Sequence, residues 1–240
     1  MPDDLGVATP ASYTSPAATS DALKPHFRLK VLPLPGYAGA PLLVLDGRDA
    51  GEQASGLTLA GGDSTVRGPS IQNFDYSGIY ITGDGNNHVG ANYLGVAPPG
   101  TEVSGNEMGV LVEGPVENVV GGTAPGAGNL ISGNETGIYI AGRSASGNRV
   151  QGNTMGLDAT GMIVLPNGQG ITINGAPGNL VGTPDIAARN VIAALPCLGD
   201  DLSLLLGRRT TPCFFGHRFV PPCSRLYSGI LHVLEAQTLT

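Results

Sequence analysis

Two short motifs near the C-terminal end contain residue types that could do chemistry. Gly199-Asp200-Asp201 is followed by Gly216-His217. Two carboxyl groups held close together can divide the roles of general acid and general base, because different surroundings push their pKa values apart. The pattern raises the hypothesis of a hydrolytic site made by Asp200, Asp201 and His217. We favour a simpler interpretation, in which the aspartates cap a short helix and His217 is incidental.

The cysteines of the same region form a second candidate site. Cys197, Cys213, His217 and Cys223 could offer zinc a tetrahedral set of thiolates and an imidazole. Their spacing is loose, however, and three cysteines also permit one disulfide with a free thiol, or no bond at all. We favour unpaired cysteines, and we predict neither a metal nor another cofactor.

A lyase site or a calcium site would need charged residues that converge on one point. A lyase needs a basic group to take a proton beside a cation or an arginine, and calcium needs several oxygen ligands. The candidate residues are instead scattered along the chain, which favours solvent-exposed arginines and turn-forming aspartates. They are Arg67, Arg143, Arg149, Arg189, Asp84, Asp158 and Asp185.

The charge and the apolar runs of the chain indicate which partners to exclude. The chain has 12 basic and 19 acidic residues, for a net charge of −7, without the basic stripe that nucleic-acid binding requires. No apolar run reaches the length of a transmembrane helix, and the first 20 residues lack the basic and apolar regions of a secretory signal. We therefore expect no nucleic-acid partner and no membrane span.

An internal repeat predicts the architecture. A glycine followed by apolar, variable and apolar residues occurs five times, at Gly56–Leu59, Gly78–Ile81, Gly109–Val112, Gly137–Ile140 and Gly170–Ile173. A second short segment follows each copy and a third often follows, and most of these segments begin with asparagine. Such a period is typical of a solenoid, in which stacked copies bury a core that one copy cannot bury alone. Three strands per coil is the simplest count.

Alternation within each copy predicts which side chains face inward. Ile79 and Ile81 should lie in the core, and Tyr80, Leu111 and Tyr139 on the outer face. The asparagines should form hydrogen-bonded ladders from coil to coil. Tyr80 and Tyr139, two coils apart, should then lie about 10 Å from each other. They could stack on a sugar, although outward tyrosines are also common on sheets for other reasons.

Several longer segments carry a resemblance to a known family. They are Pro35-Gly36-Tyr37-Ala38-Gly39-Ala40-Pro41-Leu42, Leu45-Asp46-Gly47, Asn129-Leu130-Ile131-Ser132-Gly133-Asn134, Val150-Gln151-Gly152-Asn153 and Gly156-Leu157-Asp158-Ala159-Thr160-Gly161. The region resembles the right-handed parallel β-helix repeats of large bacterial secreted and cell-surface proteins with the pectin-lyase-like fold. The resemblance implies an extracellular setting, and many such repeats are structural or adhesive.

Enzymes of that fold which cut galacturonans contain a Gly-Asp-Asp motif and a downstream Gly-His motif. This chain has similar segments, which contain Asp200, Asp201 and His217. Their upstream Asn-Thr-Asp is absent, since the nearest acid is the one in Thr183-Pro184-Asp185. Their Arg-x-Lys is absent too, since Arg225 stands in Ser224-Arg225-Leu226. The resemblance therefore implies no particular reaction.

These observations predict an all-β protein, a right-handed parallel β-helix forming one domain. Residues 1–41 form a lead-in or N-terminal cap, residues 42–192 the repeats, and residues 193–240 a non-repeat tail that is either a cap or unrelated sequence. We expect a non-catalytic fragment of a secreted or surface protein, structural or adhesive, that binds a polysaccharide or cell-surface glycan through Tyr80 and Tyr139. The alternative is a polysaccharide lyase or glycoside hydrolase of the same fold. Open strand edges would favour end-to-end self-association.

Overall fold

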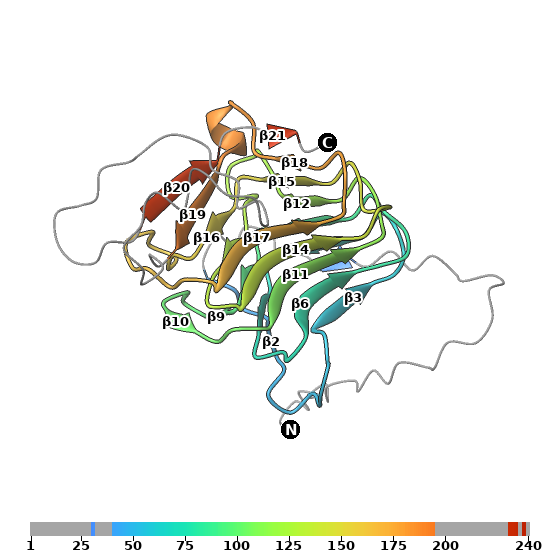
Figure 1. The fold of residues 1–240 in the computed structure, drawn as a ribbon. Helices are drawn as coiled ribbons and strands as arrows, with labels where there is room; N and C mark the ends of the chain where they lie inside the picture. The colour runs from blue at the N-terminus through green and yellow to red at the C-terminus, as the bar shows by residue number, and fades with distance from the viewer. Residues whose placement is uncertain (1–29, 32–39, 195–229, 235–236, 239–240) are drawn as a thin grey trace, which may run out of the picture.

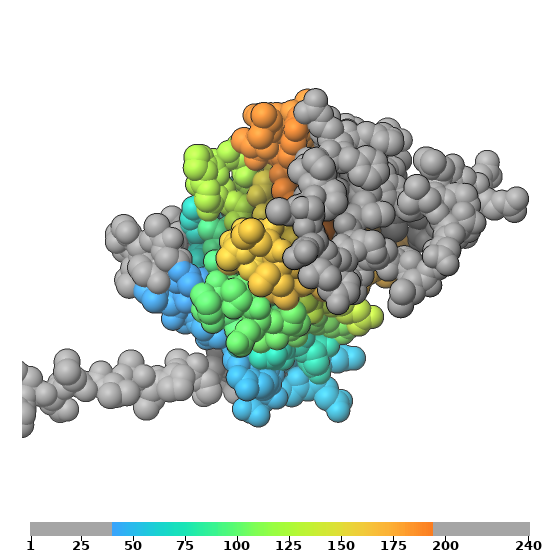
Figure 2. Space-filling view, turned by 90° about the vertical axis from the view of Figure 1, so that its left-hand side faces the viewer, coloured from blue at the N-terminus to red at the C-terminus, as the bar shows by residue number. Residues whose placement is uncertain are grey.

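The computed structural model describes residues 30–31, 40–194, 230–234 and 237–238. The chain winds through three sheets in turn, and each new turn stacks its strands beside those of the previous turn (Figure 1). The space-filling view shows the same order, with successive segments stacked along one axis (Figure 2). The predicted parallel β-helix solenoid is thereby confirmed.

The first sheet, sheet A, has seven strands. They are β1 (Lys30–Val31), β4 (Thr65–Arg67), β7 (His88–Gly90), β12 (Val119–Gly121), β15 (Arg149–Gln151), β18 (Leu180–Val181) and β21 (Gln237–Thr238). Neighbouring strands pair in parallel except for β21, which pairs with β18 in the antiparallel direction. Each strand is only two or three residues long, because a corner follows at once.

The second sheet, sheet B, also has seven strands. They are β2 (Val44–Asp46), β5 (Ser70–Gln72), β8 (Tyr93–Leu94), β13 (Leu130–Ile131), β16 (Thr154–Met155), β19 (Asn190–Ala194) and β20 (Ile230–Leu234). All pairs are parallel except that of β19 with β20. The first strand of this sheet begins at Val44, and Leu42 and Leu43 before it are exposed.

The third sheet, sheet C, carries the Gly-apolar-x-apolar copies and has five parallel strands. They are β3 (Leu57–Leu59), β6 (Ser77–Ile81), β11 (Met108–Glu113), β14 (Thr136–Ala141) and β17 (Gln169–Asn174). A two-stranded antiparallel ribbon of β9 (Val96–Ala97) and β10 (Glu102–Val103) precedes β11, and a 3₁₀ helix, η1 (Ile186–Ala188), precedes β19.

A cluster of buried hydrophobic side chains runs along the stack. Ile79, Val110 and Ile138 are register partners on successive strands, and each is fully buried. Val120 of sheet A and Ile131 of sheet B belong to the same buried cluster. The predicted column of branched aliphatic side chains is therefore confirmed, and its burial is the main source of stability.

Asparagine ladders occupy all three corners between the sheets. In the corner before sheet A, Asn118 Oδ1 accepts hydrogen bonds from the Asn87 backbone N–H (3.0 Å) and from Asn87 Nδ2 (2.9 Å). Asn118 Nδ2 in turn donates to Asn148 Oδ1 at 2.8 Å. The ladder members are Asn87, Asn118, Asn148 and Asn179, then Asn92, Asn129, Asn153 and Asn190, and finally Asn106, Asn134 and Asn167. Buried amides must find partners, and stacking identical residues supplies them coil after coil.

Candidate functional site

Some predicted site residues lie outside the residues that the structure describes. These are Asp200, Asp201, His217 and the three cysteines, so the hydrolase and zinc hypotheses stay untested predictions. Within the described ranges, no group of three or more His, Cys, Asp or Glu side chains could hold a metal ion.

Tyr80 and Tyr139 lie on the outer face of sheet C, on β6 and β14. Both are register partners of Leu111, which lies on β11 between them. This pairing separates the two tyrosines by two strand spacings, about 10 Å. Leu111 faces outward like the tyrosines, yet only 3% of its surface is exposed, so its neighbours on that face cover it. Leu111 is therefore packed among its neighbours on the outer face of sheet C.

Hydrogen bonds hold the two tyrosine rings in place. The Tyr80 hydroxyl donates to Glu113 Oε2 at 2.7 Å, and Asn174 Nδ2 donates to the Tyr139 hydroxyl at 3.0 Å. Tyr76 packs edge-on against Tyr80, with ring centroids 5.9 Å apart. Burial, and then the hydrogen bond with Glu113, raise the pKa of Tyr80, so its hydroxyl stays protonated at neutral pH. The sequence interpretation missed Tyr76, Glu113 and Asn174 because it considered only one outward position per strand.

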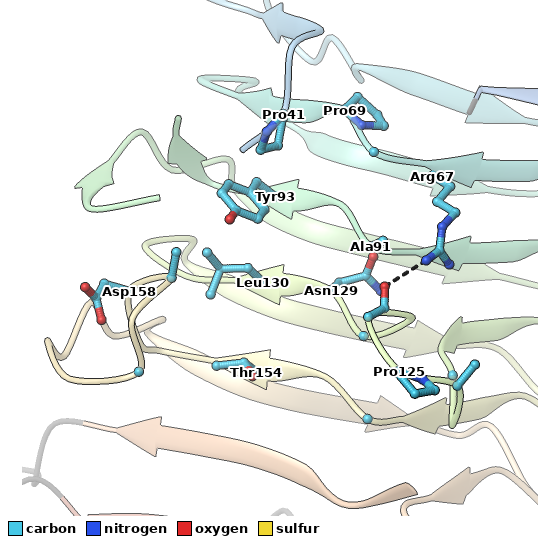
Figure 3. A pocket seen from close by; sticks show the side chains of 18 of the residues that line it. Pro41, Arg67, Pro69, Ala91, Tyr93, Pro125, Asn129, Leu130, Thr154 and Asp158 are labelled. Atoms are coloured by element: carbon cyan, nitrogen blue, oxygen red, sulfur yellow. Dashed lines mark hydrogen bonds between the residues drawn. The ribbon is translucent and has the colours of Figure 1, made fainter. Parts of the chain in front are cut away.

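A groove of about 1020 Å³ lies over the outer face of sheet B (Figure 3). Its floor consists of Tyr93, Leu130 and Thr154, which are register partners on β8, β13 and β16. Pro41 and Pro69 lie at the end nearer the first coils, as Figure 3 shows. Burial raises the pKa of the Tyr93 hydroxyl, so this ring too presents a neutral edge. The floor thus follows the stacking direction of the coils.

Two loops flank the groove on opposite sides. The first spans residues 122–126, and Arg67 Nη2 donates to the Gly126 carbonyl oxygen at 2.9 Å (Figure 3). The second spans residues 158–161 on the other side (Figure 3). A guanidinium has five N–H donors, so this one bond leaves others for a ligand. In the part of the groove lining that the structure describes, Arg67 is the sole basic residue.

Among the described residues that line the groove, Asp158 is the sole acidic one, and its carboxylate bonds within its own loop. Only 1% of Asp158 is exposed. Its oxygens accept hydrogen bonds from the Thr160 hydroxyl (2.7 and 2.9 Å) and from the backbone N–H groups of Met162 (2.9 Å) and Ile163 (3.0 Å). Burial alone would raise the pKa of Asp158, but these donors outweigh it and lower the pKa. The carboxylate therefore stays ionised, and the hydrogen bonds that it accepts come from its own loop.

A smaller hollow of about 440 Å³ lies at the corner between sheets C and A. Asp63, Asp84, Asn86 and Glu117 line it together with Val116 and two glycines. Asn86 Nδ2 donates a hydrogen bond to Asp63 Oδ1. None of the described residues that line this hollow is basic. Of the other aspartates, Asp185 caps η1 by accepting from the Ala187 N–H at 3.1 Å.

Models of protein families, curated proteins and solved structures all yield no match to the chain. In the part of the chain that the structure describes, no helix is long and apolar enough to cross a membrane.

A repeated pattern could have indicated the groove floor. The residue directly after each asparagine of the second ladder faces outward on sheet B, as in Asn92-Tyr93, Asn129-Leu130 and Asn153-Thr154. The sequence interpretation located the last two of these segments but did not ask which side chains they present to solvent. The loops that flank the floor have no such pattern.

Proposed function

We propose that this chain is a non-catalytic part of a secreted or cell-surface β-helix protein of the bacterial pectin-lyase-like type, and that it binds a polysaccharide. The groove over sheet B is the proposed site. The observation that carries the proposal is the register of Tyr93, Leu130 and Thr154 at the bottom of an open groove about 1020 Å³ in volume. Clefts of this size, with an aromatic and apolar lining and a few polar groups, suit elongated small ligands.

The chemistry of the lining favours a neutral sugar chain. A tyrosine ring offers an apolar face to the C–H side of a sugar and a hydroxyl to its edge. Arg67 and the backbone of residues 122–126 supply further hydrogen-bonding groups. A protein of net charge −7 repels a densely anionic chain at long range, and a single arginine does not offset this. A neutral polysaccharide is not repelled by the net negative charge and needs no cluster of basic residues to offset it.

The tyrosine face of sheet C is the second proposed contact. Tyr80 and Tyr139 present their rings about 10 Å apart on a rigid sheet, which suits stacking against two sugars of one chain. Their hydroxyls already contact Glu113 and Asn174, so this face supplies mostly ring surface. We therefore expect it to add to binding in the groove rather than to replace it.

Glycan-array binding tests the proposal. Wild type should bind neutral polysaccharides, and Tyr93→Ala should weaken that binding about tenfold because it removes the stacking surface. The double variant Tyr80→Ala/Tyr139→Ala is the matched control, since it removes two tyrosines from the other face and should cost less. Equal binding by wild type and Tyr93→Ala would contradict the groove as the site. No glycan binding at all would indicate a purely structural spacer.

A glycoside hydrolase is the competing function, and one observation favours it. Three carboxylates, those of Asp63, Asp84 and Glu117, line the smaller hollow. A hydrolase needs such acids to work in a pair, one of them protonated. Incubation with polysaccharides and measurement of new reducing ends should show no release above background. Release that disappears in Glu117→Gln would favour the hydrolase over the binding function.

A further inference from the structure

The sequence contains two Asn-Gly pairs, Asn167-Gly168 and Asn174-Gly175. Glycine has no side chain to shield its main-chain nitrogen, so this nitrogen can approach and attack the amide carbon of the preceding asparagine side chain. The two pairs flank one strand, since Asn167 comes just before β17 and Asn174 is its last residue. The structure places them in opposite surroundings, one buried and one exposed.

The first pair, Asn167-Gly168, is held within the coil. Asn167 belongs to the third asparagine ladder and is only 7% exposed. Its Nδ2 donates to the Ile131 carbonyl oxygen at 2.9 Å, and its Oδ1 accepts from the Asn134 backbone N–H at 3.0 Å. The Gly168 N–H donates to the Asn134 carbonyl oxygen at 2.9 Å. Both groups that would have to react are therefore engaged, and their reaction would require part of the ladder to open.

The second pair, Asn174-Gly175, has both residues exposed at the point where the chain leaves β17. Gly175 has a left-handed φ of 63°, and a Cβ built on it would meet nothing within 4 Å. Within the described ranges, the Gly175 N–H has no hydrogen-bond partner. The Asn174 side chain makes an exposed hydrogen bond, from Nδ2 to the Tyr139 hydroxyl at 3.0 Å. This pair thus has the free nitrogen and the open space that cyclisation needs.

We propose that Asn174-Gly175 is a site of spontaneous covalent modification, at which the asparagine is converted into aspartate and isoaspartate. Solvent removes the Gly175 N–H proton, and the nitrogen attacks Asn174 Cγ. The N–Cγ bond forms, the Cγ–Nδ2 bond breaks, and the amide nitrogen takes a proton from water and leaves as ammonia. Nothing is oxidised or reduced, and the product is a five-membered succinimide ring.

Water then opens the succinimide at either of its two carbonyl carbons. Cleavage of the bond between the ring nitrogen and Cγ gives an aspartate with the normal main chain. Cleavage of the bond between that nitrogen and the main-chain carbonyl carbon gives an isoaspartate, whose main chain runs through Cγ. In both products a carboxylate replaces the carboxamide, so the chain gains a negative charge and about 1 Da.

The modification would change the outer face of sheet C and leave the core closed. Both products lack the Nδ2 donor, so the Tyr139 hydroxyl would have to donate to the new carboxylate instead. Isoaspartate also adds a carbon atom to the main chain after β17, which disturbs the turn that follows. The pairing of Ile171 and Ile173 with β14 lies before this point and stays in place.

Mass spectrometry of the full chain, aged in mildly alkaline buffer, tests the inference. Fragmentation should locate a gain of about 1 Da at Asn174, and this gain should appear at least about tenfold faster than at Asn167. In water labelled with heavy oxygen, the new carboxyl group should carry one labelled atom. Equal rates at the two pairs in the folded chain, or an unchanged Asn174, would overturn the proposal.

The urea-unfolded chain is the matched reference state. Both pairs are then exposed, so Asn167 and Asn174 should react at similar rates. Similar rates in urea, together with unequal rates in the folded chain, would show that the fold selects the site. A difference that persists in urea would instead assign the selection to the flanking sequence and contradict the protection given to the ladder.

The variant Asn174→Gln tests the cyclic intermediate. Its amide stays exposed, but the corresponding ring has six members and forms less readily, so the gain in mass should be at least about tenfold slower than in wild type. A wild-type rate in this variant would indicate direct hydrolysis of the amide and would contradict cyclisation. Thermal unfolding, which should match that of wild type, checks that the coil is intact. None of these measurements depends on glycan binding.

Discussion

The outer faces of sheets B and C differ although the same coils build both. On sheet C, Leu111 fills the space between Tyr80 and Tyr139, and partners within the protein occupy the tyrosine hydroxyls. On sheet B, loops 122–126 and 158–161 rise beside Tyr93 and leave a groove. The coil thus repeats the inside of the molecule, whereas the loops between its strands build the groove on the outside.

The largest expected effect comes from the scaffold that both faces share. Asn118→Ala removes the acceptor of two hydrogen bonds from Asn87 and the donor to Asn148, all in a fully buried corner. Leaving buried polar groups without hydrogen-bond partners should lower the free energy of unfolding by about 3 kcal/mol. Urea denaturation measures this loss, and both faces should lose binding together.

Asn174→Ala is the control for the ladder. Asn174 is an exposed asparagine of β17 whose side chain donates to the Tyr139 hydroxyl. Its replacement should cost well under about 1 kcal/mol. If the two alanine variants unfold at similar urea concentrations, the ladders do not stabilise the coil as proposed.

The next smaller effect should be on glycan binding in the groove, and binding at the tyrosine face should stay unchanged. Asp158→Asn replaces a carboxylate that accepts bonds from Thr160, Met162 and Ile163. We expect a loss of about 2 kcal/mol at pH 7 and weaker glycan binding in the groove, because the loop at residues 158–161 loosens. Unchanged groove binding in a folded variant would show that this loop does not shape the site.

The pH dependence of the same variant supplies a second readout. The native pKa of Asp158 lies below its usual 3.8, so its stabilisation is complete well above 3.8 and is lost as the pH falls through the lower native pKa. The stability difference between wild type and Asp158→Asn should therefore shrink on acidification. A difference that stays constant down to the acid unfolding transition would contradict the role given to the carboxylate.

The smallest effect should appear on the sheet C face. Tyr80→Phe removes the hydroxyl that donates to Glu113 and keeps the ring that packs against Tyr76. For a partly exposed hydrogen bond we expect a loss of about 0.5 kcal/mol, with glycan stacking preserved. Thermal unfolding and glycan binding of Tyr80→Phe, beside Tyr80→Ala, would show whether the ring or the hydroxyl matters. If glycan binding falls as much in Tyr80→Phe as in Tyr80→Ala, the hydroxyl rather than the ring is needed for binding.

Much of the fold could be predicted because its determinants are local. A glycine followed by alternating residues specifies one strand and its buried side, as Ile79 and Ile81 show. Recurrence of that unit then implies stacking, since one copy has no core of its own. The start of β2 was less predictable, because Leu42 and Leu43 look like strand residues and yet lie exposed at the rim of the groove.

The candidate site was only half predictable. The outward tyrosines of sheet C follow from alternation, but the burial of Leu111 depends on what its neighbours in space do. The groove depends on contacts between distant residues. Arg67 reaches Gly126, 59 positions later, and the Ala159 N–H donates to the Gly100 carbonyl at 2.9 Å. No pattern within one repeat encodes such contacts.

The amino-acid sequence by itself determined the three-sided coil, its inward aliphatic columns and its asparagine ladders. These features recur along the chain, so successive coils present equivalent residues to one another. Tertiary structure alone decided where an outer face carries a groove. The groove depends on loops that meet across several coils, where side-chain packing rather than periodicity sets the outcome.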